Sequence, residues 1–211
     1  MRKNFTLTIF FIISLGLFSF TPKTPNPNPE SEAITNILLN YTQQKHKRLL
    51  VESYLFVSIK RQRMYHMVNN QIVGTYTISA ARNGAGNKLG SNKTPTGLHT
   101  IVEKYGYNAP KGGLFVERRF SGKVSKIHNE KYCVGSDDVT TRILWLKGDE
   151  PGLNLGGKID SYKRYIYIHG TPEEGLIGVP SSEGCIRMKN SDVIDLFTYA
   201  YVGMKVLILN E

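Results

Sequence analysis

Apolar and polar residues alternate with a period of two from residue 54 onward, which is the period of a half-buried strand. The alternation covers 54–60 and continues through 62–67 and 71–79. Asn69-Asn70, a residue pair typical of tight turns, separates the last two segments. The pattern predicts a β-hairpin near the start of the folded domain.

Further strands and one helix are predicted in the C-terminal half. After the tight turn Thr94-Pro95-Thr96-Gly97, the strand segments are 98–102, 140–146, 165–168 and 205–209. A helix is predicted to begin with Asn190 or Ser191 as N-cap and to end before Gly203. Residues 105–134 have no clean period, which is typical of long loops or irregular strands over a site. The fold class is therefore mainly β with a few short helices.

The first 51 residues have a different character. Arg2 and Lys3 precede an apolar run that ends at Phe20, which is the layout of a secretory signal, so 1–20 is predicted to be a signal peptide or an uncleaved membrane anchor. Residues 21–30 are proline-rich and predict an extended tether. Residues 31–51 are predicted to form a short helical lead-in, and residues 52–211 are predicted to form one folded domain. We therefore expect an exported protein of the periplasm or cell envelope.

Composition narrows the partners. A chain of 211 residues with 40% hydrophobic residues suits one domain plus a leader. Lysine and arginine exceed aspartate and glutamate by 27 to 17, which favours anionic polymers such as bacterial wall or anionic lipid. No nucleic-acid recognition motif is found, so nucleic acid is not an expected partner. A membrane contact is expected only through an uncleaved N-terminal anchor.

Two cysteines allow two interpretations. In an oxidising compartment Cys133 and Cys185 could form a structural disulfide. Alternatively, Cys185 is a free nucleophile and Cys133 is a small buried hydrophobic residue. The second interpretation fits the chemistry of the segment around Cys185 better.

The segment 168–188, IHGTPEEGLIGVPSSEGCIRM, carries the strongest chemical signal. His169 and Cys185 each stand beside a glycine, which lets the backbone approach a substrate closely. A thiol needs a base to form its thiolate, and His169 is the candidate. Backbone N–H groups around Gly184 and Cys185 are candidate oxyanion donors. The segment thus predicts nucleophilic catalysis by cysteine.

These residues resemble the L,D-transpeptidase catalytic domain, also called the YkuD domain. Its signature is a histidine followed by Ser/Thr-His-Gly-Cys, a hydrophobic residue, and Arg or Asn. The matching residues, in order, are His169, Ser182, Gly184, Cys185, Ile186 and Arg187. The resemblance covers roughly residues 54–209 and implies a β-sandwich-like fold without a metal or organic cofactor.

The resemblance also implies a reaction and a set of roles. Cys185 would attack the bond between the L-centre of a diamino acid and the terminal D-alanine of a peptidoglycan stem. The acyl group would then pass to an amine on another stem or a lipoprotein, or to water. On the same analogy Gly170 orients His169, and Arg187 supports the nucleophile loop or binds the substrate carboxylate. Ser182 is either a third catalytic group or a residue that holds the turn.

One position departs from the family signature, because Glu183 stands where the family has histidine. A carboxylate beside Cys185 disfavours the thiolate by repulsion unless Arg187 or the His169 cation compensates, so activity is expected to be weakened or redirected. Glu183 itself is expected to contact the substrate. Three alternatives therefore stay open: an L,D-carboxypeptidase or crosslink hydrolase, and a wall-binding module without catalysis. A zinc site from His169, Cys185 and Glu183 lacks a fourth ligand and is not expected.

The remaining polar residues receive no catalytic role from the sequence. His66, His99 and His128 are expected to be structural or exposed. The carboxylates Asp137, Asp138, Asp149 and Glu150 are expected to lie on solvated loops, because nothing around them forms an acid and base pair.

Overall fold

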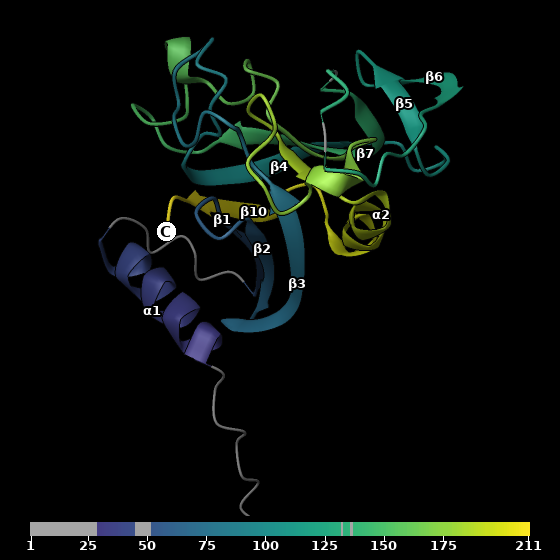
Figure 1. Cartoon of the computed structure of the whole chain (residues 1–211). Coiled ribbons are helices and arrows are strands. Elements are labelled where there is room, and N and C mark those ends of the chain that lie inside the picture. The colour runs from purple at the N-terminus through teal and green to yellow at the C-terminus, as the bar shows by residue number, and fades with distance from the viewer. Residues whose placement is uncertain (1–28, 45–51, 132, 136) are drawn as a thin grey trace, which may run out of the picture.

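The computed structural model describes residues 29–44, 52–131, 133–135 and 137–211 (Figure 1). The signal or anchor predicted for 1–20 lies outside these residues, as does the tether up to residue 28. Among the described helices, none has both the length and the apolar composition that crossing a membrane would require.

The described residues contain ten strands that share one sheet. The strands are β1 Ser53–Ser58, β2 Arg63–Val68, β3 Gln71–Ser79, β4 Gly97–Tyr105, β5 Gly113–Val116, β6 Arg119–Val124, β7 Val139–Gly148, β8 Tyr167–Gly170, β9 Ile186–Met188 and β10 Lys205–Leu209. Their order is β4-β10-β1-β2-β3-β9-β8-β7-β5-β6. Because β4 also pairs with β7, eight strands close into a ring and the β5–β6 hairpin projects from it (Figure 1). The prediction of a mainly β fold is confirmed.

The interior of this ring is the main hydrophobic core. Side chains from opposite parts of the ring meet there, as in a sandwich: Leu55, Met64, Ile78, Ile101, Leu144, Ile168, Ile186 and Val206. The helix α2 Asn190–Tyr199 adds Val193 and Leu196 to the same cluster. Successive residues of a strand face opposite sides, so the neighbours of these core residues point outward. The candidate site is built on that outer side.

The helix α1 Pro29–Gln44 covers a second outer surface, over β1, β2 and β10 (Figure 1). Its buried Ile34 and Leu38 stand four residues apart and pack against apolar side chains of these strands. The helix begins at Pro29, two residues before the predicted start, because proline suits the first helical position and acidic residues follow in the first turn. The described part of the lead-in, residues 31–44, is therefore packed on the sheet.

Two elements escaped the sequence pattern. The predicted turn at Asn69-Asn70 is confirmed, with both residues in the left-handed region (φ 49° and 61°). Glu117-Arg118 makes the same kind of turn between β5 and β6 (φ 48° and 67°), although neither residue signals it. The short strand β9 was also missed. Within the described ranges there are also two single-turn 3₁₀ helices, η2 Gly157–Ile159 and η3 Glu174–Leu176.

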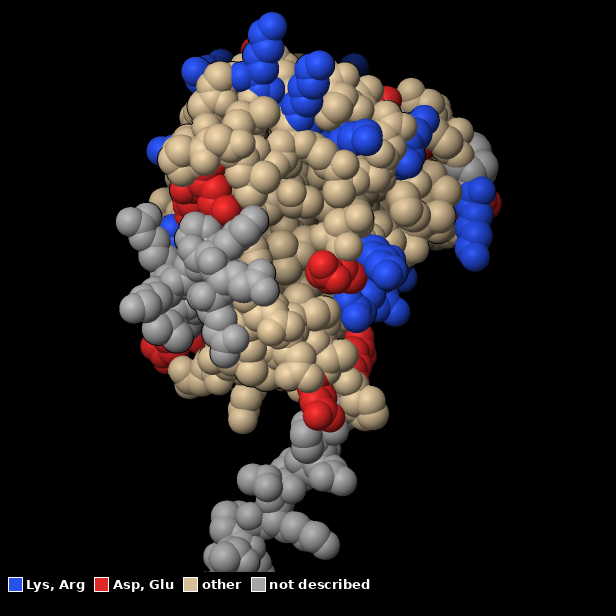
Figure 2. Space-filling model, turned by 90° about the vertical axis from the view of Figure 1, so that its left-hand side faces the viewer, with Lys and Arg blue, Asp and Glu red and all other residues tan. Residues whose placement is uncertain are grey.

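The charge of the chain is unevenly distributed on the surface. Lysine and arginine account for 27 residues against 17 acidic ones. Figure 2 shows the basic side chains mainly along the upper and right-hand margins of the face in view, around a broad uncharged area. On this face the basic side chains therefore gather at the margins.

Candidate active site

The strands β8 and β9 run parallel and bring the two ends of the candidate segment together. His169 pairs with Arg187, and Ile168 pairs with Ile186. Both isoleucines point into the core, so His169 and Arg187 share the outer face. Cys185 immediately precedes β9, and its sulfur accepts a hydrogen bond from the Tyr167 N–H (3.3 Å) on that face. The fold therefore places Cys185 and His169 as diagonal neighbours on one side of the sheet.

The orientation of His169 is set by the residue that follows it. Its Nδ1–H donates to the carbonyl oxygen of Gly170 (2.8 Å), as expected, which leaves Nε2 as the basic nitrogen of the neutral ring. A Cβ at position 170 would lie 2.5 Å from Asn190 Oδ1 and 2.9 Å from the Thr140 carbonyl oxygen. Only glycine fits between these groups, so the orienting carbonyl depends on Gly170.

The thiol of Cys185 is protonated in this environment. Burial raises its pKa to about 12, and the nearby Asp137 carboxylate adds to the rise. The Tyr167 N–H, Arg187 and Arg164 act in the opposite direction but are outweighed. The thiol donates to the Tyr165 carbonyl oxygen (3.4 Å). A base must therefore remove this proton before the sulfur can attack.

His169 is suited to receive that proton. Burial lowers the pKa of its imidazole below 6.5, although Asp137 partly offsets the effect, so the ring is neutral at neutral pH. Among the described residues, no hydrogen bond joins the His169 ring to the Cys185 sulfur. Catalytic hydrogen bonds are often long before substrate binds, so the absence of this contact in the resting structure does not exclude the role. The resting pair is thus a neutral thiol and a neutral imidazole.

Arg187 is part of a buried ion-pair cluster. Its side chain is 1% exposed and contacts Asp137 Oδ1 through Nε (2.6 Å) and Nη2 (2.5 Å). Its Nη1 lies 2.7 Å from Glu173 Oε2, and Glu173 is fully buried. The expected contact of Arg187 with a substrate carboxylate does not fit this burial, whereas support of the nucleophile loop does. Asp137 is likewise part of the site, and the expectation of a solvated loop was wrong for it.

The turn before Cys185 is held by its own polar groups. Ser182 Oγ donates to the Cys185 carbonyl oxygen (2.6 Å) and accepts from the Gly184 N–H (3.2 Å), which makes Ser182 a turn-holding residue. Gly184 has φ 135°, a conformation that other residues rarely adopt. The Glu183 N–H donates to Asp137 Oδ2 (2.9 Å), while its side chain is exposed. The carboxylate that raises the pKa of the Cys185 thiol is therefore Asp137, and the repulsion expected from Glu183 is not among its causes.

An aromatic cluster lies beside Cys185, and no pattern in the sequence predicts it. Cys185 packs with Trp145 and Tyr167 from the neighbouring strands. The Trp145 ring stacks on Tyr165 with centroids 5.7 Å apart, and the Arg118 guanidinium lies 4.7 Å from the Trp145 centroid. Arg118 comes from the β5–β6 turn, so the irregular segment does contribute to the site. These groups offer an aromatic and cationic surface next to the sulfur.

The second cysteine, Cys133, differs from Cys185 in its exposure to solvent. Cys133 is exposed, so the prediction of a small buried residue was wrong. It precedes the segment that carries Asp137, which runs along the protein surface. Both cysteines are free thiols in this structure, which agrees with the interpretation of Cys185 as an unpaired cysteine.

The model of the YkuD family, the L,D-transpeptidase catalytic domain, matches residues 52–208. The chain belongs to this family. It is 24% identical over 160 residues to the putative L,D-transpeptidase YqjB of Bacillus subtilis, covering 76% of this chain and 73% of that protein. It is 42% identical over 60 residues to the putative L,D-transpeptidase YkuD of the same organism, covering 26% and 37%.

Solved structures of L,D-transpeptidases also resemble the fold. L,D-transpeptidase 3 from Mycobacterium tuberculosis, in complex with a faropenem-derived adduct, matches with a TM-score of 0.46 at 13% identity, over 74% of this chain and 60% of that one. The chain thus spans less than two thirds of the length of this solved relative. The family assignment of this L,D-transpeptidase domain rests on the match over residues 52–208.

Proposed function

We propose that this domain is a peptidoglycan L,D-transpeptidase in which Cys185 is the nucleophile and His169 the base. The observation that supports this best is the parallel pairing of β8 and β9, which brings both residues to one outer face. We expect the protein to work outside the cytoplasm, in the cell envelope, where its polymer substrate lies. No cofactor is needed for this chemistry.

The first half of the reaction forms an acyl-enzyme. His169 Nε2 takes the proton from the Cys185 thiol as the sulfur attacks the carbonyl carbon between the diamino acid and D-alanine. The tetrahedral intermediate collapses when the C–N bond breaks and the imidazolium returns its proton to the leaving amine of D-alanine. The products are a thioester on Cys185 and free D-alanine.

The second half transfers the acyl group. An amine from another stem or from a lipoprotein attacks the thioester carbonyl, His169 accepts its proton, and the Cys185 thiol is restored with that proton. An oxyanion forms in both halves of the reaction and is stabilised by backbone N–H donors. One such donor lowers the activation free energy by about 3 kcal/mol. The Gly184 N–H already donates to Ser182, so we assign this role to the Cys185 N–H. We assign Glu183, whose side chain is exposed, to contact with the substrate.

The test is product analysis with the full chain, a tetrapeptide stem that ends in D-alanine, and an amine acceptor. Release of D-alanine with a crosslinked dimer supports transfer, and tripeptide alone would assign a carboxypeptidase instead. Cys185→Ala and His169→Gln should abolish D-alanine release, whereas Cys133→Ala serves as the matched cysteine control and should retain it. An unmodified protein without any turnover would leave a wall-binding module as the function.

The departure at Glu183 is tested in the same assay. Glu183→His restores the residue of the family signature, and it should change the rate or its pH dependence while the parent protein is already active. A parent protein that becomes active only after this substitution would contradict the proposal.

A further inference from the structure

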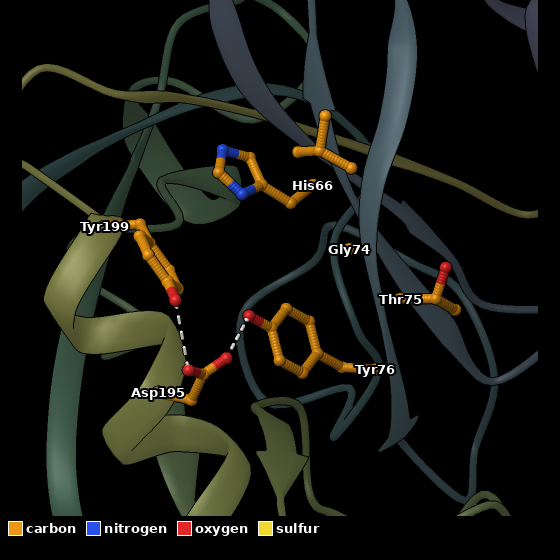
Figure 3. Close-up of a pocket in the computed structure, with 7 residues that line it drawn as sticks. His66, Gly74, Thr75, Tyr76, Asp195 and Tyr199 are labelled. Carbon is orange, nitrogen blue, oxygen red and sulfur yellow. Dashed lines mark hydrogen bonds between the residues drawn. The ribbon is translucent and has the colours of Figure 1, made fainter.

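A cavity of about 390 Å³ lies away from Cys185, between the strands β2 and β3 and the helix α2 (Figure 3). Its lining residues His66 and Tyr76 belong to the inner face, because they stand two positions from the core residues Met64 and Ile78. On β3, the residue paired with Arg187 is Ser79, beyond the cavity towards the active site. The residues that line the cavity are not those of the candidate active site, so the two sites are separate.

Two tyrosines converge on one carboxylate in this cavity. Tyr76 Oη donates to Asp195 Oδ2 (2.8 Å), and Tyr199 Oη donates to Asp195 Oδ1 (3.3 Å), as the dashed lines in Figure 3 show. Burial and the contact with Asp195 raise the pKa of Tyr76, so its hydroxyl keeps the proton that it donates. Both phenol protons are thus committed to the carboxylate. The remaining lone pairs of all three groups are acceptors.

The other walls are aromatic or uncharged. The His66 ring lies 5.9 Å from the Tyr199 ring, centroid to centroid, and burial lowers the pKa of His66, so the ring is neutral at neutral pH. His66 Nε2 is already hydrogen-bonded to Ser53 Oγ (2.9 Å). Among the described residues that line the cavity, none is lysine or arginine. On a chain with net charge +10, this cavity is locally acidic and rich in acceptors and ring surface.

A ligand that complements these walls must supply donors and positive charge. An ammonium group brings three N–H donors and is attracted by the faces of aromatic rings. We propose that this cavity is a second binding site, for an ammonium group on an alkyl chain such as a lysine or diamino-acid residue carries. Asp195 would pair with the ammonium group, and the rings of Tyr199 and His66 would pack along the alkyl chain. The inference goes beyond the proposed function and does not depend on it.

Gly74 provides a way to block the cavity without removing a polar group. A Cβ at this position would lie 3.6 Å from His66 Cβ and 4.0 Å from Tyr76 Oη, which is ordinary contact. Its backbone is not in the left-handed region, so a larger side chain fits the strand and projects into the cavity. Gly74→Leu is therefore the occluding variant, and Asp195→Asn is the variant that removes only the charge.

The experiment is a binding titration of the full chain by NMR or calorimetry. The probe is Nα-acetyl-lysine methylamide, and Nα-acetyl-norleucine methylamide is its uncharged analogue; N-acetylglucosamine represents a neutral sugar. The lysine derivative should bind at least tenfold more tightly than both other probes. Asp195→Asn should remove this preference and Gly74→Leu should remove binding. Glu117→Gln, which deletes an acidic residue in the distant β5–β6 turn, should leave binding unchanged.

Three outcomes would overturn the proposal: equal binding of the norleucine or sugar probe, an unchanged lysine preference in Asp195→Asn, or unchanged binding of the lysine derivative in Gly74→Leu. Circular dichroism of each variant checks that it is folded. If Asp195→Asn does not fold, the test rests on the binding of the lysine derivative to Gly74→Leu. Cys185→Ala should bind the probe as the parent does. Failure of the transpeptidase assay therefore leaves this test intact, and the reverse also holds.

Discussion

Replacement of Arg187 by methionine tests the role of the buried ion-pair cluster. The arginine side chain is 1% exposed and faces a fully buried Glu173 and a 23% exposed Asp137. Arg187→Met keeps most of the side-chain volume but leaves the Glu173 carboxylate buried without its cation. Removing one partner of a buried pair costs about 3–5 kcal/mol. The loss is expected near the lower end, because Asp137 can reach solvent.

The assay is urea unfolding followed by circular dichroism, with thermal unfolding as a second measurement. For a chain of this size each kcal/mol corresponds to about 2–4 °C in Tm, so a loss near 3 kcal/mol in Arg187→Met should lower Tm by roughly 6–12 °C. The matched control is Arg119→Met in the exposed strand β6, which should stay within about 0.5 kcal/mol of the parent. A double variant with Glu173→Gln should recover part of the loss, since it removes the uncompensated charge.

An Arg187→Met protein as stable as the Arg119→Met control would contradict a stabilising role of the buried ion pairs. In that case the contacts of 2.5–2.7 Å would contribute nothing net to stability. The same stability in the single Arg187→Met variant and the double variant would separately show that the uncompensated charge of Glu173 does not account for the loss.

Three further predictions concern the thiol, the base and the first helix. Because the pKa of Cys185 is raised to about 12, its alkylation by iodoacetamide at pH 8 should be over tenfold slower than that of N-acetylcysteine. Peptide mass spectrometry measures this rate, and a pH dependence of alkylation with its midpoint near pH 8.5 would contradict the prediction. Burial lowers the pKa of His169 below 6.5, so the imidazole stays neutral, and able to act as a base, as the pH falls to that value. The rate of D-alanine release should therefore be level from pH 8 to about 6.5 and decline only below it. A decline that begins above pH 7 would be inconsistent with the lowered pKa of His169. Ile34→Ala removes a fully buried side chain of α1 and should cost about 2–5 kcal/mol in urea unfolding, whereas an unchanged midpoint would mean that the helix is not part of the folded domain.

The sequence predicts the strands where one face is buried and the period of two is clear. The hairpin around Asn69-Asn70 is such a case, because turn chemistry and alternation agree. The strand β9 has only three residues, all buried, so its pattern carries no period. The hairpin β5–β6 is almost entirely exposed along β6 and turns at Glu117-Arg118, neither of which favours a left-handed backbone. Local patterns cannot reveal elements of these kinds.

In the candidate active site too, the sequence predicts some residues and misses others. His169, Gly170 and Cys185 stand within one segment beside glycines, so the sequence identifies them together. Asp137 and Trp145 come from a separate part of the chain and reach the site only through the pairing of β7 with β8 and the burial of Arg187. Their roles depend on tertiary contacts that spacing along the chain does not encode.

The central claim is that Cys185 forms a thioester with a stem peptide while His169 takes its proton. The most direct measurement is the intact mass of the full chain, mixed with tetrapeptide and quenched in acid, followed by peptide mapping. We expect an acyl adduct on Cys185 with the mass of the stem minus D-alanine. This adduct should be absent in Cys185→Ala and strongly reduced in His169→Gln. An adduct on Cys133, or D-alanine release that persists in Cys185→Ala, would contradict it.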